Sequence, residues 1–128
     1  MSGKANSASM NGAICYLEIP ATDPKHSAQF YHDVFGWALR YHHEDGTIAF
    51  DDNTNTPRQV SGMWVTDRPP MDKIGIVISI MVDDAEKTVK KIVRYGGEIV
   101  RPLGFNPHER IAWFRDPGGN ILGIYQEP

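Results

Sequence analysis

Apolar residues occupy every second position in the stretch ICYLEIP near the start of the chain, which predicts a β-strand. One face of this strand carries Cys15, Leu17 and Ile19, and we expect it in the hydrophobic core. Because free cysteine is among the most often buried residue types, Cys15, the single cysteine of the chain, is predicted to be a buried structural thiol. The opposite face carries Tyr16 and Glu18. If that face lines a cavity, this phenol and this carboxylate are candidates for contact with a ligand.

The next segment, ATDPKHSAQFYHDVFGW, changes to the spacing of an amphipathic helix. Asp23 is suited to the N-cap, Pro24 to the first helical position and Gly36 to the stop. The apolar stripe of this helix is formed by Ala28, Tyr31, Val34 and Phe35. The segment therefore predicts a helix with one buried side.

The same order recurs in GIVISIMVDDAEKTVKKIVRYGGEIV, where a predicted strand over 76–82 is followed by a second predicted helix. Asp84 stands at the start of this helix, and the pair Gly96–Gly97 stands at its end. Gly97 follows Gly36 at the same interval along the chain at which Asp84 follows Asp23. The apolar face of the second helix carries Ala85, Val89, Ile92 and Val93, and we expect it to be buried. Because caps and stops keep one register, an internal duplication is predicted.

Each predicted helix is followed by three short runs with the composition of β-strands. WALRYHHE, TIAFDD and QVSGMWVTD follow the first helix, and EIVRPLG, RIAWFRD and NILGIYQ follow the second. Each half is thus predicted to be a βαβββ module, and the fold class is α+β. We place the first module at about 12–67 and the second at about 74–127, within a single domain over 12–127, and we expect residues 1–11 to form a disordered tail. One module leaves a sheet face uncovered, so two modules are expected to pair and to enclose a central cavity.

Composition narrows the function classes. The 128 residues suit one domain. The 13 Lys+Arg against 16 Asp+Glu give a formal charge of -3 without a basic stripe, which argues against a nucleic-acid partner. No apolar run approaches the roughly 20 residues that cross a membrane, and the polar start of the chain does not resemble a signal peptide. Together with the lone cysteine, these features predict a cytoplasmic location and no membrane partner.

The motifs FYHDVFGW and DPGGN, placed as they are within paired βαβββ modules, resemble the vicinal oxygen chelate superfamily. This superfamily includes glyoxalase I, extradiol dioxygenases, fosfomycin-resistance enzymes and bleomycin-resistance proteins. The resemblance covers residues 12–127 and is strongest to the glyoxalase-like, lactoylglutathione lyase-related subgroup. It implies a curved mixed sheet around a central cavity. Since bleomycin-resistance proteins are dimers with clefts between subunits, it also implies a homodimer.

The metalloenzymes of this superfamily bind a divalent metal with a His on the first strand of each module and with carboxylates or similar groups on the closing strands. On this sequence the resemblance places Tyr16, Val77 and Gly123 at three of these positions, and the fourth falls in QVSGMWV, which has no Asp, Glu or His. His26 and His32 do not restore the set, because they lie about 240° apart around a helix. A divalent metal needs three or four converging N or O donors, so we expect no metal and no other cofactor.

The constant offset between the two halves extends the cavity face into the second module, and alternation on the last strand adds two positions. Three aromatic residues lie on flanking strands whose phase the sequence does not fix. The predicted ligand-binding set is Tyr16, Glu18, Phe50, Trp64, Val77, Ser79, Met81, Trp113, Gly123 and Tyr125. An aromatic pocket with few polar groups suits a small, partly apolar ligand. The same aromatic side chains could instead fill the cavity as a second core.

Two function classes follow from this set. In the first, the chain binds or sequesters a small molecule, as bleomycin-resistance proteins do. In the second, it is a metal-independent enzyme of lyase or isomerase type, with Glu18 and Tyr16 as acid–base candidates. A buried Glu18 would have a raised pKa unless a cation such as Arg101 or Arg115 pairs with it. Metal-dependent glyoxalase or dioxygenase chemistry is disfavoured by the donor count.

Overall fold

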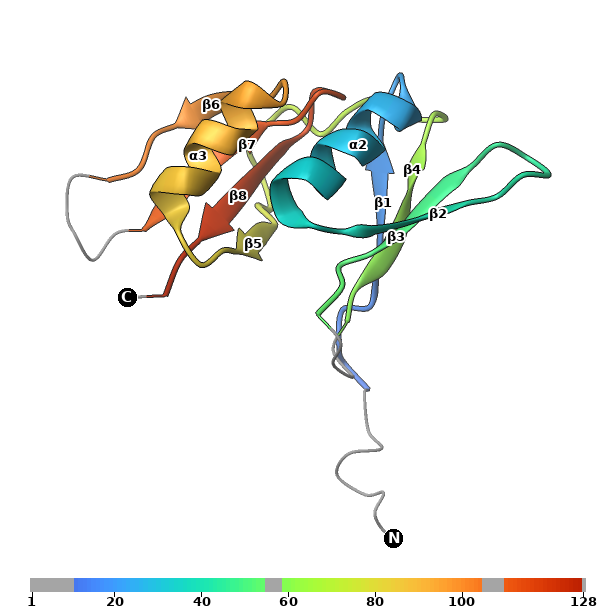
Figure 1. Cartoon of the computed structure of the whole chain (residues 1–128), viewed down its shortest axis with the longest axis horizontal. Helices are drawn as coiled ribbons and strands as arrows, with labels where there is room; N and C mark the ends of the chain where they lie inside the picture. The colour runs from blue at the N-terminus through green and yellow to red at the C-terminus, as the bar shows by residue number, and fades with distance from the viewer. Residues whose placement is uncertain (1–10, 55–58, 105–109, 128) are drawn as a thin grey trace, which may run out of the picture.

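The computed structural model describes residues 11–54, 59–104 and 110–127, and it contains two four-stranded mixed sheets with one helix each (Figure 1). The predicted α+β class with two βαβββ modules is confirmed. The predicted N-terminal tail lies outside the described residues except for Asn11. Within the described ranges, no helix is long and apolar enough to cross a membrane.

The first module forms a sheet with the strand order β1-β4-β3-β2, in which β1 is parallel to β4 and the other pairs are antiparallel. Its elements are β1 (Tyr16–Pro20), α2 (Pro24–Phe35), β2 (Ala38–Tyr41), β3 (Ile48–Asp51) and β4 (Ser61–Val65). The short strand β1 is an edge strand, so one side of its backbone has no neighbour in this sheet.

The second module repeats this topology with the order β5-β8-β7-β6. Its elements are β5 (Ser79–Met81), α3 (Ala85–Arg94), β6 (Glu98–Arg101), β7 (Ile111–Arg115) and β8 (Ile121–Tyr125). The strand predicted over 76–82 is therefore shorter than expected. It pairs with β8 over three residues only, and Ile76 before it is 82% exposed.

The predicted caps are confirmed. The Asp23 side chain accepts a hydrogen bond from the His26 backbone N–H at 3.4 Å, and Asp84 accepts one from the Lys87 N–H at 3.1 Å. Gly36 follows α2 with φ 76°, a left-handed conformation that glycine adopts without strain. In α3 the residue with positive φ is Gly96, at 104°, so the predicted stop at Gly96–Gly97 lies one residue beyond the C-cap.

Two burial predictions are wrong. Cys15 is exposed, because β1 begins only at Tyr16 and Cys15 therefore lies before the part of the chain that has a buried face. Val93 is 58% exposed, because the buried side of α3 is centred on Thr88 and Ile92. A helix turns by about 100° per residue, so the residue after Ile92 already points away from the sheet.

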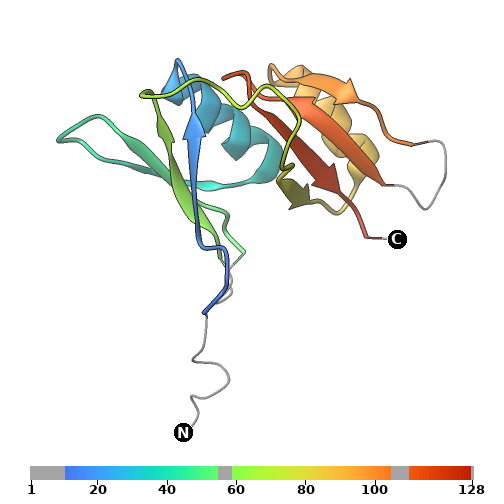
Figure 2. The same cartoon turned by 180° about the vertical axis from the view of Figure 1, so that it is seen from behind.

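Each helix packs on one face of its own sheet, and the opposite faces carry no helix (Figure 2). We call these the open faces. On the first sheet the open face includes Tyr16 and Glu18, whereas Leu17 and Ile19 point to the α2 side. The two helices also contact one another, so the modules are joined through the helix side of both sheets.

A buried polar network joins the two modules. The Tyr31 hydroxyl of α2 donates to Asp116 Oδ2 at 2.8 Å, and the Asn120 backbone N–H donates to Asp116 Oδ1 at 2.9 Å. The Asn120 side chain then donates to the Pro20 carbonyl at 2.7 Å and accepts from the Met71 N–H at 2.8 Å. Burial raises the pKa of Tyr31, which keeps its hydroxyl protonated as a donor. The DPGGN turn is thus tied to the first module as well as to its own sheet.

Candidate functional site

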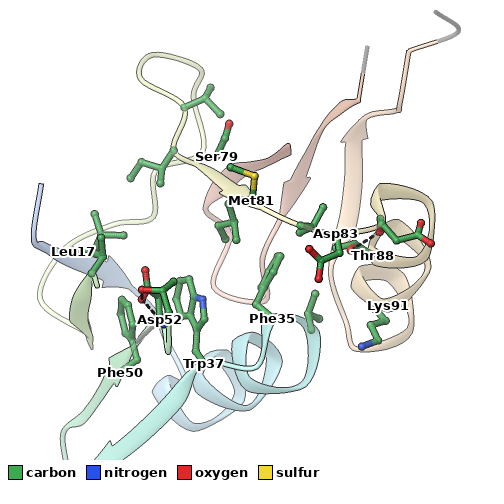
Figure 3. Close-up of a pocket in the computed structure, with 18 of the residues that line it drawn as sticks. Leu17, Phe35, Trp37, Phe50, Asp52, Ser79, Met81, Asp83, Thr88 and Lys91 are labelled. Atoms are coloured by element: carbon green, nitrogen blue, oxygen red, sulfur yellow. Dashed lines mark hydrogen bonds between the residues drawn. The ribbon is translucent and has the colours of Figure 1, made fainter. Parts of the chain in front are cut away.

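The two modules enclose a pocket of about 870 Å³ on the helix side of the first sheet (Figure 3). Side chains of β1, β3 and the end of α2 form one side of it, and residues 76–84 together with α3 form the other. It lies between elements that are far apart in the sequence, so no single segment predicts it.

The floor of the pocket is aromatic. The Trp37 ring is stacked between Tyr31, with centroids 4.6 Å apart, and Phe50, with centroids 4.4 Å apart. Phe35 stands beside this stack, with its centroid 6.1 Å from that of Trp37. Gly62 lies opposite Phe50 in the sheet, and a Cβ there would come within 2.6 Å of the Phe50 ring, so glycine makes the room for it. The floor is thus a closely packed group of aromatic rings.

The walls are aliphatic and the rim is charged. Leu17 of β1 and Ile78 and Ile80 of the second module belong to the lining. The charged and polar residues of the lining are Asp52, Thr54, Ser79, Asp83, Asp84, Thr88, Lys87 and Lys91. Asp84 is occupied by the cap of α3, whereas Asp52 and Asp83 are at the cavity edge on opposite modules (Figure 3).

The structure brings together only part of the predicted ligand-binding set. Phe50, Val77, Ser79 and Met81 line the pocket. Trp64 is 2% exposed and packs behind the floor, with its centroid 4.9 Å from that of Phe50. The remaining members, which are not part of the lining, are Tyr16, Glu18, Trp113, Gly123 and Tyr125.

On the open face of the second sheet, Gly123 lies at the centre of a small cluster. A Cβ on Gly123 would come within 2.8 Å of Ser79 Oγ, 3.2 Å of Val77 Cγ1 and 3.3 Å of Trp113 Cδ1. The Arg101 guanidinium stands 5.3 Å from the Trp113 ring centroid, a cation–π distance. These neighbours take up the space into which a longer side chain at position 123 would extend.

Tyr16 and Glu18 lie on the open face of the first sheet and are partly exposed. Glu18 Oε1 accepts from Arg68 at 2.7 Å, with 43% of the Glu18 side chain exposed. The predicted partners are wrong: Arg115 pairs with Glu98, and Arg101 stacks on Trp113. Arg68 lies in the connector between the two modules. The sequence does not fix the path of this connector, so the pairing of Arg68 with Glu18 could not be predicted.

The positions that hold a metal in the family to which the resemblance pointed do not fit one here. Val77 and Gly123 supply no donor, and Tyr16 is paired in the sheet with Ser61, whose hydroxyl donates to Asp51. Across residues 11–54, 59–104 and 110–127, no three His, Cys, Asp or Glu side chains are grouped so that they could hold a metal ion. These positions therefore do not form a metal centre on which a reaction could depend.

Sequence reasoning missed Leu17, Trp37, Asp52 and the α3 side of the pocket. Alternation did assign Leu17 to the apolar face, but that face was expected to be filled core. Trp37 directly follows Gly36, the residue that ends the first helix. An aromatic residue at that place was a signal that could have added Trp37 to the predicted set.

Comparison with known proteins agrees with this architecture. A family model described as Glyoxalase/Bleomycin resistance protein/Dioxygenase superfamily matches residues 13–124. A glyoxylase-like domain-containing protein of Didymella fabae is 30% identical over 126 residues, covering 93% of this chain and 97% of that protein. A lactoylglutathione lyase of Neisseria meningitidis is 32% identical over 111 residues, covering 79% and 80%.

Solved structures share the fold at low identity. TnmS3, an antibiotic binding protein from Streptomyces sp. CB03234, has a TM-score of 0.67 at 20% identity and covers 91% of this chain and 97% of its own. The fosfomycin resistance protein FosX from Mesorhizobium loti has a TM-score of 0.71 at 12% identity, with 94% and 95% covered. The chain belongs to the glyoxalase/bleomycin resistance protein/dioxygenase superfamily.

Proposed function

We propose that this chain binds a small, partly apolar molecule in the pocket between its two modules, and that binding needs no metal. The observation that carries the proposal is the cavity of about 870 Å³, with an aromatic floor, aliphatic walls and a few polar groups at its edge. Small-molecule sites are typically clefts of about 300–1,000 Å³ with mostly apolar walls and a few placed polar groups. The cavity has the size and the chemistry of such a site.

The relatives point to both binding and catalysis, and the residues of this chain favour binding. A lactoylglutathione lyase is among the similar proteins, and an antibiotic binding protein is among the similar folds. The ligand positions of a metal-dependent lyase are Tyr16, Val77 and Gly123 here, which is not a metal-binding set. Acid–base catalysis by Glu18 has little support, since this carboxylate is half exposed and paired with Arg68 instead of being desolvated.

The working unit of this proposal is a homodimer. The strongly exposed apolar residues around β1 and β5 are Ile14 at 76%, Ile76 at 82% and Met81 at 61%. Ile14, Ile76 and Met81 also border the pocket, so a second copy packed on them would narrow its mouth. Sedimentation equilibrium should give about twice the 14.4 kDa chain mass at micromolar concentration. The substitution Ile76→Lys should shift the protein to the monomer, and a wild-type monomer would contradict this part of the proposal.

The binding proposal is tested with a neutral probe, 2-(2-naphthyl)ethanol, titrated by calorimetry into protein kept in a chelator. Leu17 and Tyr16 are neighbours on β1 that point to opposite faces, so they form a matched pair of variants. Leu17→Trp should fill the cavity and abolish binding, and Tyr16→Ala should leave it within about twofold. Loss on Tyr16→Ala alone would place the site on the open face and overturn the proposal, as would binding that requires an added divalent metal.

A further inference from the structure

The polar groups of the pocket indicate which chemical class of ligand it takes, and this inference rests on the proposed function above. Trp37 is 4% exposed, and both faces of its ring are covered by Tyr31 and Phe50. The edge with the indole nitrogen turns towards the cavity (Figure 3). This N–H has no acceptor among the described residues, and unlike the Trp64 N–H it is not fully buried. A donor that loses water without gaining an acceptor is costly, so a bound ligand that offers an oxygen atom here would gain affinity.

Asp52 supplies a carboxylate next to this donor. Its Oδ1 accepts from the backbone N–H and the hydroxyl of Thr54, at 3.3 and 3.1 Å, while Oδ2 has no donor among the described residues. Asp83 lies on the opposite module and is exposed, so it is not part of this contact. Carboxylates only accept hydrogen bonds, and they do so most strongly from charged donors. The ligand is therefore expected to supply a cationic donor.

Lys87 and Lys91 are the opposing charges of the lining, one turn apart on α3. Both are exposed, and Lys91 lies beyond Phe35 on the α3 side, whereas Asp52 lies beside Trp37 and Phe50 (Figure 3). A charge in bulk water is screened far more strongly than one against a buried apolar floor. At the aromatic floor the Asp52 carboxylate therefore favours a ligand with a positive charge.

We infer that the pocket takes an amphipathic amine: an apolar, ring-sized body with a protonated amine held by Asp52, and a nearby neutral oxygen that accepts from the Trp37 indole N–H. An aryl amino alcohol has this arrangement. The apolar body lies between the aromatic floor and the aliphatic walls of Leu17 and Ile78.

Four probes that share a naphthyl body test the inference by calorimetry: 2-(2-naphthyl)ethanol, 2-(2-naphthyl)ethylamine, 2-naphthylacetic acid and 2-amino-1-(2-naphthyl)ethanol. We expect the amine to bind at least about tenfold more tightly than the acid, as a charge-assisted hydrogen bond implies. The amino alcohol should bind several-fold more tightly than the amine and should shift the indole N–H resonance of Trp37.

The variants separate the charge at Asp52 from its structural role. Asp52→Asn should weaken amine binding about tenfold and leave the neutral alcohol unchanged. Asp45 is a matched control, since its Oδ1 accepts from the N–H and hydroxyl of Thr47 in the same way, outside the pocket. Asp45→Asn should change nothing. Asp52→Ser gives a second reading if Asp52→Asn does not fold.

Equal or tighter binding of the acid would overturn the inference while leaving the proposed function intact, provided that the neutral alcohol binds. An unchanged affinity for the amine in both Asp52→Asn and Asp52→Ser would overturn it as well. If none of the four probes binds, the proposed function fails together with the inference.

Discussion

Removing the Tyr31 hydroxyl tests the packing of the two modules against one another. The hydroxyl donates to Asp116 Oδ2 at 2.8 Å, Tyr31 has no exposed surface and Asp116 is 3% exposed. In Tyr31→Phe the ring keeps its stacking on Trp37, so the change removes only the hydrogen bond. A hydrogen bond to a charged group contributes about 1.5–3 kcal/mol, and the acceptor that remains is buried. We expect the free energy of unfolding to fall by about that amount.

Urea unfolding followed by circular dichroism measures this loss. With an m-value of about 1.5 kcal/mol/M for a chain of this size, the midpoint should fall by about 1–2 M at unchanged m. Tyr41→Phe is the control, since Tyr41 is 52% exposed and its change should stay within about 0.5 kcal/mol. A Tyr31→Phe protein that unfolds at the wild-type urea concentration would refute the reasoning that this network joins the modules.

Three further predictions concern pH, packing and metal. Burial raises the pKa of Asp116 above 3.8, so between 3.8 and that raised pKa the folded chain binds more protons than the unfolded chain. The free energy of unfolding should therefore fall as the pH rises through this window. Urea titrations of Asp116→Asn at several pH values should lack this component. Gly123→Ala should cost about 1–3 kcal/mol by overpacking against Ser79, and adding Ser79→Ala should restore part of it, whereas Gly75→Ala, in open space, should show no such loss by thermal melting. Elemental analysis of untagged protein, purified without chelator and then offered Zn, Ni, Mn and Fe(II), should find no stoichiometric metal, and one tightly held ion per chain would contradict the donor argument.

The local elements were predictable because their signals are local. Asp23 and Asp84 satisfy the first N–H groups of their helices through side chains three residues away, and Gly36 ends its helix through its own φ. These interactions depend on residues that are close in the sequence. The same residue types recur at a constant interval in the second half, so the order of helices and strands could be predicted from the sequence. The βαβββ topology followed from that order.

The site was less predictable because it depends on how the modules are placed. Alternation separated Leu17 from Tyr16 correctly, but only the packing of the second module decides which of the two faces borders a cavity. Trp113 and Gly123 lie together on an open face, although the sequence did not fix the phase of Trp113. The predicted burial of Cys15 was wrong for a related reason, since β1 begins at Tyr16 and Cys15 precedes the strand.

The central claim is that an apolar molecule enters the pocket between the modules without a metal. A two-dimensional NMR titration of chelator-treated protein with 2-(2-naphthyl)ethanol tests it most directly, because the three tryptophan side chains report separate places. Shifts are expected at the Trp37 indole N–H and at the methyl groups of Leu17, Ile78 and Ile80, with little change at Trp113. Shifts confined to Tyr16, Trp113 and Gly123, or shifts that appear only after a divalent metal is added, would contradict it.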